Sequence, residues 1–266
     1  MIDFSEIQDI YFILPLLGFI IGLFGTMVGG GGGFFFLPIL TLLLKVPAQA
    51  AVITSLVATL PICIVGSLGH YRKNNIDFKV ATLFMVTGII GAFIGAEITS
   101  RISDLALKTA FGIYSILIAL NMALSAKKNT IEREKEKTKI SPRDLKTLKG
   151  SSFGLAAGLI TGTFGTSGTA PILAGLFSMR IPFKMVIGTS LLAVLVNTIF
   201  AVGAHFIVGK IDLTLVIFLT AGSTLGAIIG PRLLAKIQID KSESKAKYAY
   251  AIIMVAIGIL MILGRN

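Results

Sequence analysis

The stretch Gly25–Leu40, GTMVGGGGGFFFLPIL, places five consecutive glycines, Gly29 to Gly33, inside an apolar part of the chain. Consecutive glycines make a poor helix, because glycine loses more conformational freedom on ordering than any other residue. At membrane depth, irregular backbone is tolerated only where it is buried in protein or lines a polar cavity. The stretch therefore predicts a helix break with a functional role, in preference to a surface for close helix packing.

The composition around this stretch is that of a membrane protein. The 266 residues are 55% hydrophobic and 14% charged, whereas a soluble domain carries about a quarter charged residues. Apolar runs of about 20 residues, enough to cross a bilayer, recur at 47–70, 80–100, 105–125, 183–208, 213–235 and 246–263, with two more near 10–45 and 150–179. We expect an all-α, multi-pass protein of the cell membrane. The acidic start, MIDFSEIQDIYF, does not resemble a signal peptide, so the first apolar run should stay in the mature protein.

Several function classes are disfavoured by what the sequence lacks. The single cysteine, Cys63, excludes an internal disulfide or a paired-cysteine metal site. No GK[ST] follows the glycines, so a nucleotide P-loop is excluded, and no catalytic triad, HExxH or paired-carboxylate pattern occurs. We therefore expect no enzyme activity, no cofactor and no metal. The net charge of +11 falls in loops between apolar runs, where the positive-inside rule explains it without a nucleic-acid partner.

The sequence contains an internal repeat. Shifted by 135 residues, the second half matches the first at Pro47 and Pro182, at TSL 54–56 and 189–191, at His70 and His205, at Asp77 and Asp212, and at GAFIG 91–95 and GAIIG 226–230. Upstream, GLFGTMVGGGGGFFFLPIL resembles GLITGTFGTSGTAPIL with a three-residue difference in length. We predict two homologous transmembrane repeats, 1–125 and 150–266, joined by a charged cytoplasmic linker, 126–149.

The first segment of each repeat decides how the two repeats are oriented. A straight helix over residues 10–45 would be about 54 Å long, against a hydrocarbon core of about 30 Å, so it must break or fold back. A hairpin gives each repeat an odd number of crossings and therefore opposite orientations, and it also gathers most Lys and Arg on one side. We predict an inverted repeat with both termini outside, and parallel repeats are the alternative.

The glycine-rich stretches predict an anion site. A helix that restarts after a break has unpaired N–H groups and the positive end of the helix dipole, which together bind oxyanions. The second stretch, TGTFGTSGTAP, adds hydroxyl groups to the same pattern. Two tips that enter from opposite faces would form one dehydrated site. Its predicted residues are Thr26, Gly29, Gly30, Gly31, Gly32 and Gly33, together with Thr163, Gly165, Thr166, Ser167, Gly168 and Thr169.

Polar residues inside the spans are costly and need an explanation. Thr54, Ser55, Thr189, Ser190 and Asn197 are predicted to line the substrate cavity, although Ser and Thr hydroxyls can also bond only to their own helix. His70 and His205 are either interfacial anchors or groups that couple transport to protons.

Other residues near helix ends have simpler interpretations. Glu97 and its repeat partner Arg232 are expected to reach the membrane interface or to gate the path as a pair, and Asp77 and Asp212 to cap helix N-termini. Close helix packing is expected at four glycine pairs: Gly18 and Gly22, Gly91 and Gly95, Gly154 and Gly158, and Gly226 and Gly230.

The glycine-rich stretch, the paired TSL segments, GAFIGAEI and GAIIGPRL together resemble the TauE/SafE family of membrane anion transporters, known as sulfite exporters. The resemblance covers nearly the whole chain apart from the linker. It implies export of sulfite, sulfoacetate or related organosulfonates. The chain departs from the family pattern at GTSGTAP, where the family more often repeats a run of glycines.

We therefore expect a secondary transporter that exports a small sulfur-containing anion by alternating access, with proton coupling as an option. Its partners would be the anion and the lipid bilayer, and it would act as a monomer or a homodimer. The alternatives are an anion channel, a carrier for another small anion such as thiosulfate or a carboxylate, and a membrane-embedded scaffold. The scaffold is disfavoured because the sequence offers only a short linker outside the membrane.

Overall fold

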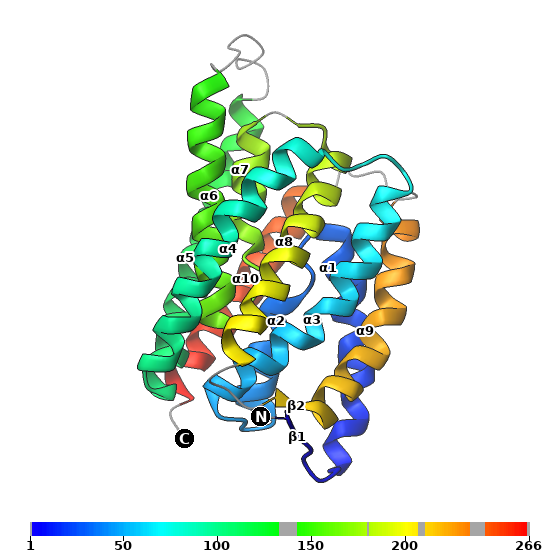
Figure 1. Cartoon of the computed structure of the whole chain (residues 1–266), viewed down its shortest axis with the longest axis vertical. Coiled ribbons are helices and arrows are strands. Elements are labelled where there is room, and N and C mark those ends of the chain that lie inside the picture. Colours follow the sequence, from blue (N-terminus) through cyan, green and yellow to red (C-terminus); the bar gives the residue numbers. More distant parts are fainter. Residues whose placement is uncertain (1, 133–142, 180, 207–210, 235–242, 265–266) are drawn as a thin grey trace.

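The computed structural model describes residues 2–132, 143–179, 181–206, 211–234 and 243–264. Helices form almost all of this part of the chain and pack side by side in one bundle (Figure 1). Two short strands within it, β1 (Ile2–Asp3) and β2 (Ile211–Asp212), pair in parallel. Within the described residues, six helices are long and apolar enough to cross a membrane. The prediction of an all-α, multi-pass membrane protein is confirmed.

The uninterrupted apolar runs form single helices close to their predicted bounds. These helices are α3 (Ala48–Tyr71), α4 (Phe78–Arg101), α5 (Asp104–Glu132), α8 (Phe183–Phe206), α9 (Leu213–Leu234) and α10 (Glu243–Leu263). Both α3 and α8 begin directly after a proline. Proline suits a helix start because it has no backbone N–H group that needs an acceptor there. Part of the predicted linker belongs to helix ends, since α5 continues to Glu132 and α6 begins at Arg143, while residues 133–142 lie outside the described part.

The first glycine-rich stretch separates α1 (Leu14–Val28) from α2 (Gly33–Pro38), and α2 continues into a π-helical turn, η2 (Ile39–Leu43). A 3₁₀ turn, η1 (Asp9–Ile13), precedes α1. Figure 1 shows α1 rising from the lower end of the bundle and α3 beginning at that same end, so α2 and η2 lead the chain back. The predicted re-entrant hairpin is therefore present.

The second stretch repeats this arrangement between α6 (Arg143–Phe164) and α7 (Thr169–Ser178). Each break begins and ends with a glycine in the left-handed region: Gly29 has φ 82° and Gly32 φ 75°, while Gly165 has φ 63° and Gly168 φ 53°. Side-chain-bearing residues rarely adopt this conformation. The two breaks are thus equal in length, and the length difference between the repeats falls after them, where α2 and η2 replace α7.

Small residues bring two pairs of helices into backbone contact. A Cβ added to Gly22 of α1 would lie 2.0 Å from Ser223 O of α9, and one added to Gly226 of α9 would lie 2.1 Å from Phe19 O of α1. The same arrangement joins α4 and α6, where an added Cβ on Gly95 would lie 2.3 Å from Leu159 O. The predicted packing role is confirmed at these glycines. Each contact joins the first half to the second.

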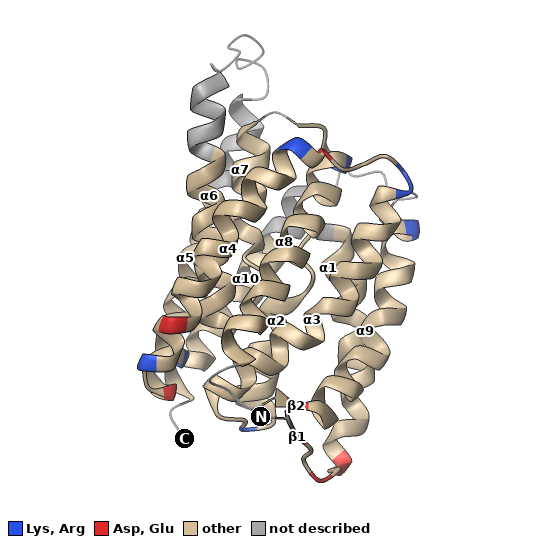
Figure 2. Ribbon diagram, viewed as in Figure 1, with Lys and Arg blue, Asp and Glu red and all other residues tan. Residues whose placement is uncertain are grey.

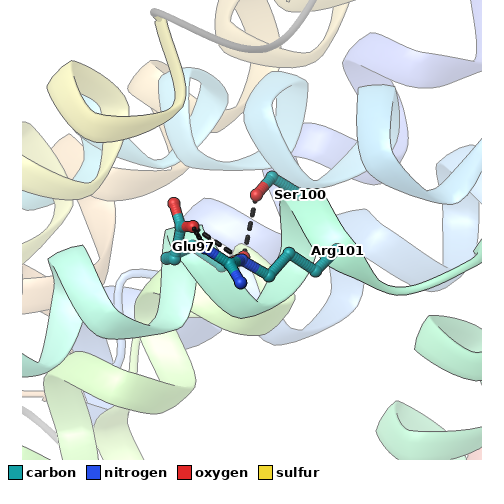
Figure 3. A network of polar contacts seen from close by, with 3 residues as sticks. All are labelled: Glu97, Ser100 and Arg101. Carbon is teal, nitrogen blue, oxygen red and sulfur yellow. Dashed lines mark hydrogen bonds and ion pairs between the residues drawn. The ribbon is translucent and has the colours of Figure 1, made fainter.

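Charged side chains of the described residues lie toward the two ends of the bundle (Figure 2). Asp77 accepts a hydrogen bond from Val80 N at 3.1 Å, and Asp212 accepts one from Leu215 N at 3.2 Å, so both are the N-caps that the sequence predicts. Glu97 pairs with Arg101 one turn further along α4, with Arg101 Nε 2.7 Å from Glu97 Oε1 (Figure 3). This exposed contact does not involve Arg232.

Candidate functional site

The two helix breaks lie against each other inside the bundle. Thr169 Oγ1, on the first residue of α7, is 3.0 Å from Gly30 O in the first break. A Cβ added to Gly33 would lie 3.1 Å from Ser167 N in the second break. Residues Gly31 to Gly33 and Gly165 to Gly168 are buried. The predicted meeting of the two glycine-rich stretches is therefore observed as a contact between them.

Helix α3 also reaches the first break, through residues that the sequence analysis did not place in the site. A Cβ added to Gly31 would lie 2.5 Å from Cys63 Sγ, and one added to Gly33 would lie 2.8 Å from Thr59 Oγ1. Thr59 and Cys63 follow Ser55 at intervals of four residues, which places all three on one face of α3. That spacing was a signal available in the sequence.

The second break presents a row of unpaired backbone donors. Within the described part of the chain, the N–H groups of Thr166, Ser167, Gly168, Thr169 and Ala170 have no hydrogen-bond acceptor. Gly168 caps α7 without any side-chain hydrogen bond to the helix start. Unpaired N–H groups in a buried segment are rare in folded proteins. The buried members of this row, Thr166 to Gly168, together with the first N–H groups of α7, can donate to a water molecule or to a ligand with acceptor atoms.

The first break presents a shorter row. The N–H groups of Gly30 and Gly31 donate to Gly25 O, at 2.8 and 3.2 Å. Those of Gly32, Gly33 and Phe34 have no acceptor among the described residues. Since Gly33 lies beside Ser167, the unpaired donors of the two breaks are neighbours.

The TSL serines connect each half to the break of the other half. Ser55 Oγ donates to Gly165 O at 2.8 Å, and Ser190 Oγ donates to Gly29 O at 2.7 Å. All four residues are buried. Because a hydroxyl group has one proton, these two side chains have acceptor capacity left but no donor for an anion.

The TSL threonines connect the halves at a second pair of points. Asp77 N donates to Thr189 Oγ1 at 2.9 Å, and Asp212 N lies 3.4 Å from Thr54 Oγ1. Each threonine therefore accepts a hydrogen bond from the N-cap residue of a helix in the other half, α4 for Thr189 and α9 for Thr54. The four TSL hydroxyls form a reciprocal set of contacts across the interface between the halves.

The remaining predicted threonines differ in their partners. Thr26 Oγ1 donates to Gly22 O of its own helix at 2.9 Å, and Thr163 Oγ1 lies 3.4 Å from Gly95 O of α4. Ser167 Oγ is 2.9 Å from Thr169 Oγ1. Thr169 Oγ1 is within donating distance of both Gly30 O and Ser167 Oγ, and its single proton serves one of them at a time. Thr166 Oγ1 is buried and has no partner within the described residues.

Helix α8 carries further buried polar groups without partners. Neither amide atom of Asn197 has a hydrogen bond within the described part of the chain, and the same holds for Thr198 Oγ1. Asn197 packs where α4 has no side chain, since a Cβ on Gly88 would lie 2.3 Å from its Nδ2. Asn197 therefore faces α4, and within the described residues its amide makes no hydrogen bond to either break.

The two histidines differ although the repeat relates them. His205 Nε2 is 2.6 Å from Gly162 O, near the end of α6. Neither ring nitrogen of the buried His70 has a partner among the described residues. A surface hollow of about 480 Å³ is lined by Ser67, Tyr71 and mostly apolar side chains of α3, α4, α8 and the connection between α3 and α4, and by no residue of either break.

The chain is similar to membrane transporters. The family model described as "Sulfite exporter TauE/SafE" matches residues 14–261. The chain is 29% identical over 229 residues to the probable membrane transporter protein YdhB of Bacillus subtilis (strain 168), an alignment that covers 84% of this chain and 88% of that protein. It is 28% identical over 262 residues to a probable membrane transporter protein of Xylella fastidiosa (strain Temecula1 / ATCC 700964), covering 93% and 91%. No solved structure matches the chain.

Proposed function

Because the chain belongs to the TauE/SafE family of membrane transporters, we propose that it exports a small sulfur-containing anion, such as sulfite, sulfoacetate or a related organosulfonate, by alternating access. The observation that carries this proposal is the pair of adjacent rows of unpaired N–H groups, Gly32 to Phe34 and Thr166 to Ala170. The family and the relatives' names describe transporters and not enzymes. The protein is therefore treated as a carrier whose binding site lies between the breaks.

An anion suits these donors for an energetic reason. A buried donor left without an acceptor costs about 1–3 kcal/mol, and several such groups lie together here. An oxyanion has three or four oxygen atoms that accept hydrogen bonds, and it is attracted by the positive end of the α7 dipole. The hydroxyl of Thr166 adds one further donor in the same segment.

The absence of fixed positive charge at the breaks suits transport. No Lys or Arg occurs between Phe12 and Leu44 or between Gly150 and Met179. An anion bound only by backbone and hydroxyl groups exchanges more readily than one paired with a buried arginine, because a desolvated ion pair resists separation. Reversible binding is what a carrier needs to release its substrate.

Inversion of the two halves is part of this proposal. Figure 1 shows α3 running upward and α8, its counterpart in the second half, running downward. Oppositely oriented repeats around one central site are a common basis for alternating access. Burial of both breaks favours a carrier over an open channel, because a channel would keep a continuous wet path past them.

The test is a thermal-shift screen of the purified protein in detergent against small anions. Sulfite, sulfoacetate, thiosulfate, acetate and chloride would be added as sodium salts at equal ionic strength. A ligand at 100 times its Kd stabilises the folded state by about 2.7 kcal/mol, so we expect a rise in Tm with sulfite or sulfoacetate that exceeds the rise with chloride. If sulfite and sulfoacetate raise the Tm no more than chloride does, the proposed substrate class is wrong.

A flux assay separates the carrier from the channel. In proteoliposomes, the carrier should give saturable flux of the anion identified by the thermal shift, and trapped unlabelled anion should accelerate the uptake of labelled anion. Flux that rises linearly with concentration and does not respond to trapped anion would indicate a channel.

A further inference from the structure

The TSL serines make the same hydrogen bond in both halves, but the N–H groups of the two peptides that they hold differ in whether they have an acceptor. In a trans peptide the carbonyl oxygen and the next N–H point in opposite directions. A side chain that fixes the carbonyl therefore also fixes the direction of that N–H. Ser55 holds Gly165 O, so it sets the direction of the Thr166 N–H.

The Thr166 N–H is one of the unpaired donors of the second break. In the first break, Ser190 holds Gly29 O, and the N–H of the same peptide belongs to Gly30, which donates to Gly25 O at 2.8 Å. Ser55 therefore holds a peptide whose N–H group is unpaired, whereas Ser190 holds a peptide whose N–H group already donates within the protein.

From this difference we propose that Ser55 is a positioning residue of the anion site, which it serves by aiming the Thr166 N–H at the anion. The proposal rests on the function proposed above. Ser55 does not touch the anion as a donor, because its only proton goes to a carbonyl oxygen, and Val52 O at 2.8 Å is the one alternative acceptor to Gly165 O.

Contacts with α3 and α6 also restrict the backbone at Gly165. A Cβ added to Gly165 would lie 2.5 Å from Ser55 Oγ and 2.4 Å from Val52 O, so α3 lies directly against this residue. Gly165 N donates to Thr161 O at 3.0 Å, which holds the other side of the residue. Loss of the Ser55 hydroxyl would remove the hydrogen bond that fixes the orientation of the Gly165–Thr166 peptide.

The test compares the saturation kinetics of Ser55→Ala and Ser190→Ala in proteoliposomes, with sulfite as the transported anion. We expect Ser55→Ala to raise KM about tenfold, the factor that corresponds to one weakened hydrogen bond to a charged group, with Vmax within about twofold of the wild type. Ser190→Ala should lower the Tm by about as much as Ser55→Ala does, but it should raise KM much less. Ser178→Ala is the matched control, because its hydroxyl bonds only to Gly175 O on an exposed face of α7.

If Ser55→Ala does not fold, a second variant tests the same inference. Ser55→Cys keeps the shape of the side chain with a larger terminal atom and replaces the hydroxyl by a weak S–H donor, so it should also raise KM with little change in Vmax. Equal KM values for the Ser55 and Ser190 variants, or a Ser55 variant that changes only Vmax or Tm, would overturn the inference. If the wild type itself shows no saturable flux of sulfite, sulfoacetate or a related organosulfonate, the proposed function fails instead.

Discussion

Gly165 illustrates how a single residue meets two demands in the second break. Its φ of 63° lies in the left-handed region, and an added Cβ would be too close to both Val52 O and Ser55 Oγ. The first demand is local and the second comes from another helix. Glycine is therefore required here both for the turn and for the approach of α3.

The histidines invite a test of proton coupling, which remains a hypothesis. A carbonyl oxygen only accepts hydrogen bonds, so His205 Nε2 must be the donor to Gly162 O. We predict that a double variant, His70→Gln with His205→Gln, binds the anion as the wild type does but loses the pH dependence of transport, because glutamine does not titrate near neutral pH. The glutamine amide can still donate to Gly162 O.

This prediction is checked by measuring anion flux into proteoliposomes between about pH 4 and pH 8, a window that extends below the usual range of histidine titration. The thermal shift with the anion serves as the control for binding. A double variant whose flux keeps the wild-type pH profile would remove both histidines from the mechanism.

At the level of helices, two interfaces join the halves through backbone contacts between small residues. In α4 and α6, a Cβ on Gly158 would lie 1.8 Å from Gly88 O, and in α1 and α9, a Cβ on Gly222 would lie 1.7 Å from Pro15 O. Lipid provides no hydrophobic driving force between helices, so close contact of this kind is a main source of their association. These interfaces also hold α1 and α6, which lead into the breaks.

We predict that Gly158→Ala destabilises the protein although alanine is the better helix former. The added methyl group forces α6 away from α4, and such overpacking costs about 1–3 kcal/mol. The measurement is the Tm in detergent without anion.

Gly203→Ala in α8 is the matched control, since among the described residues no atom outside the adjacent backbone of its own helix lies within 4 Å of the position its Cβ would take. Its Tm should equal or exceed that of the wild type. A Gly158→Ala protein as stable as Gly203→Ala would show that the backbone contact between α4 and α6 is not close in the membrane.

For the molecule as a whole, the ends of the bundle differ in charge. Arg72, Lys79, Lys184 and Arg232 lie at the ends of α3, α4, α8 and α9 that point upward in Figure 1, and the first strand β1 and the end of α10 lie at the opposite end (Figures 1 and 2). The positive-inside rule assigns the upper end to the cytoplasm. The outside location of both termini is therefore a prediction of this arrangement.

Single-cysteine labelling in intact cells tests this topology. Glu6 and Lys73 are both exposed and lie at opposite ends, whereas the native Cys63 is buried. We predict that Glu6→Cys reacts with a membrane-impermeant maleimide in intact cells and that Lys73→Cys reacts only after permeabilisation. The wild type is the control, and the reverse labelling pattern would invert the orientation.

The amino-acid sequence by itself determined the helical spans, the two breaks, the repeat and the N-caps at Asp77 and Asp212. These features depend on hydrophobic length, glycine conformation and local hydrogen bonding, all of which are set by neighbours along the chain. Only the tertiary structure decided which residues of the two breaks touch, that Thr59 and Cys63 border the first break, and that each TSL serine holds the break of the other half. A hydroxyl can bond any acceptor that packing brings near, so its partner depends on contacts between residues more than a hundred positions apart.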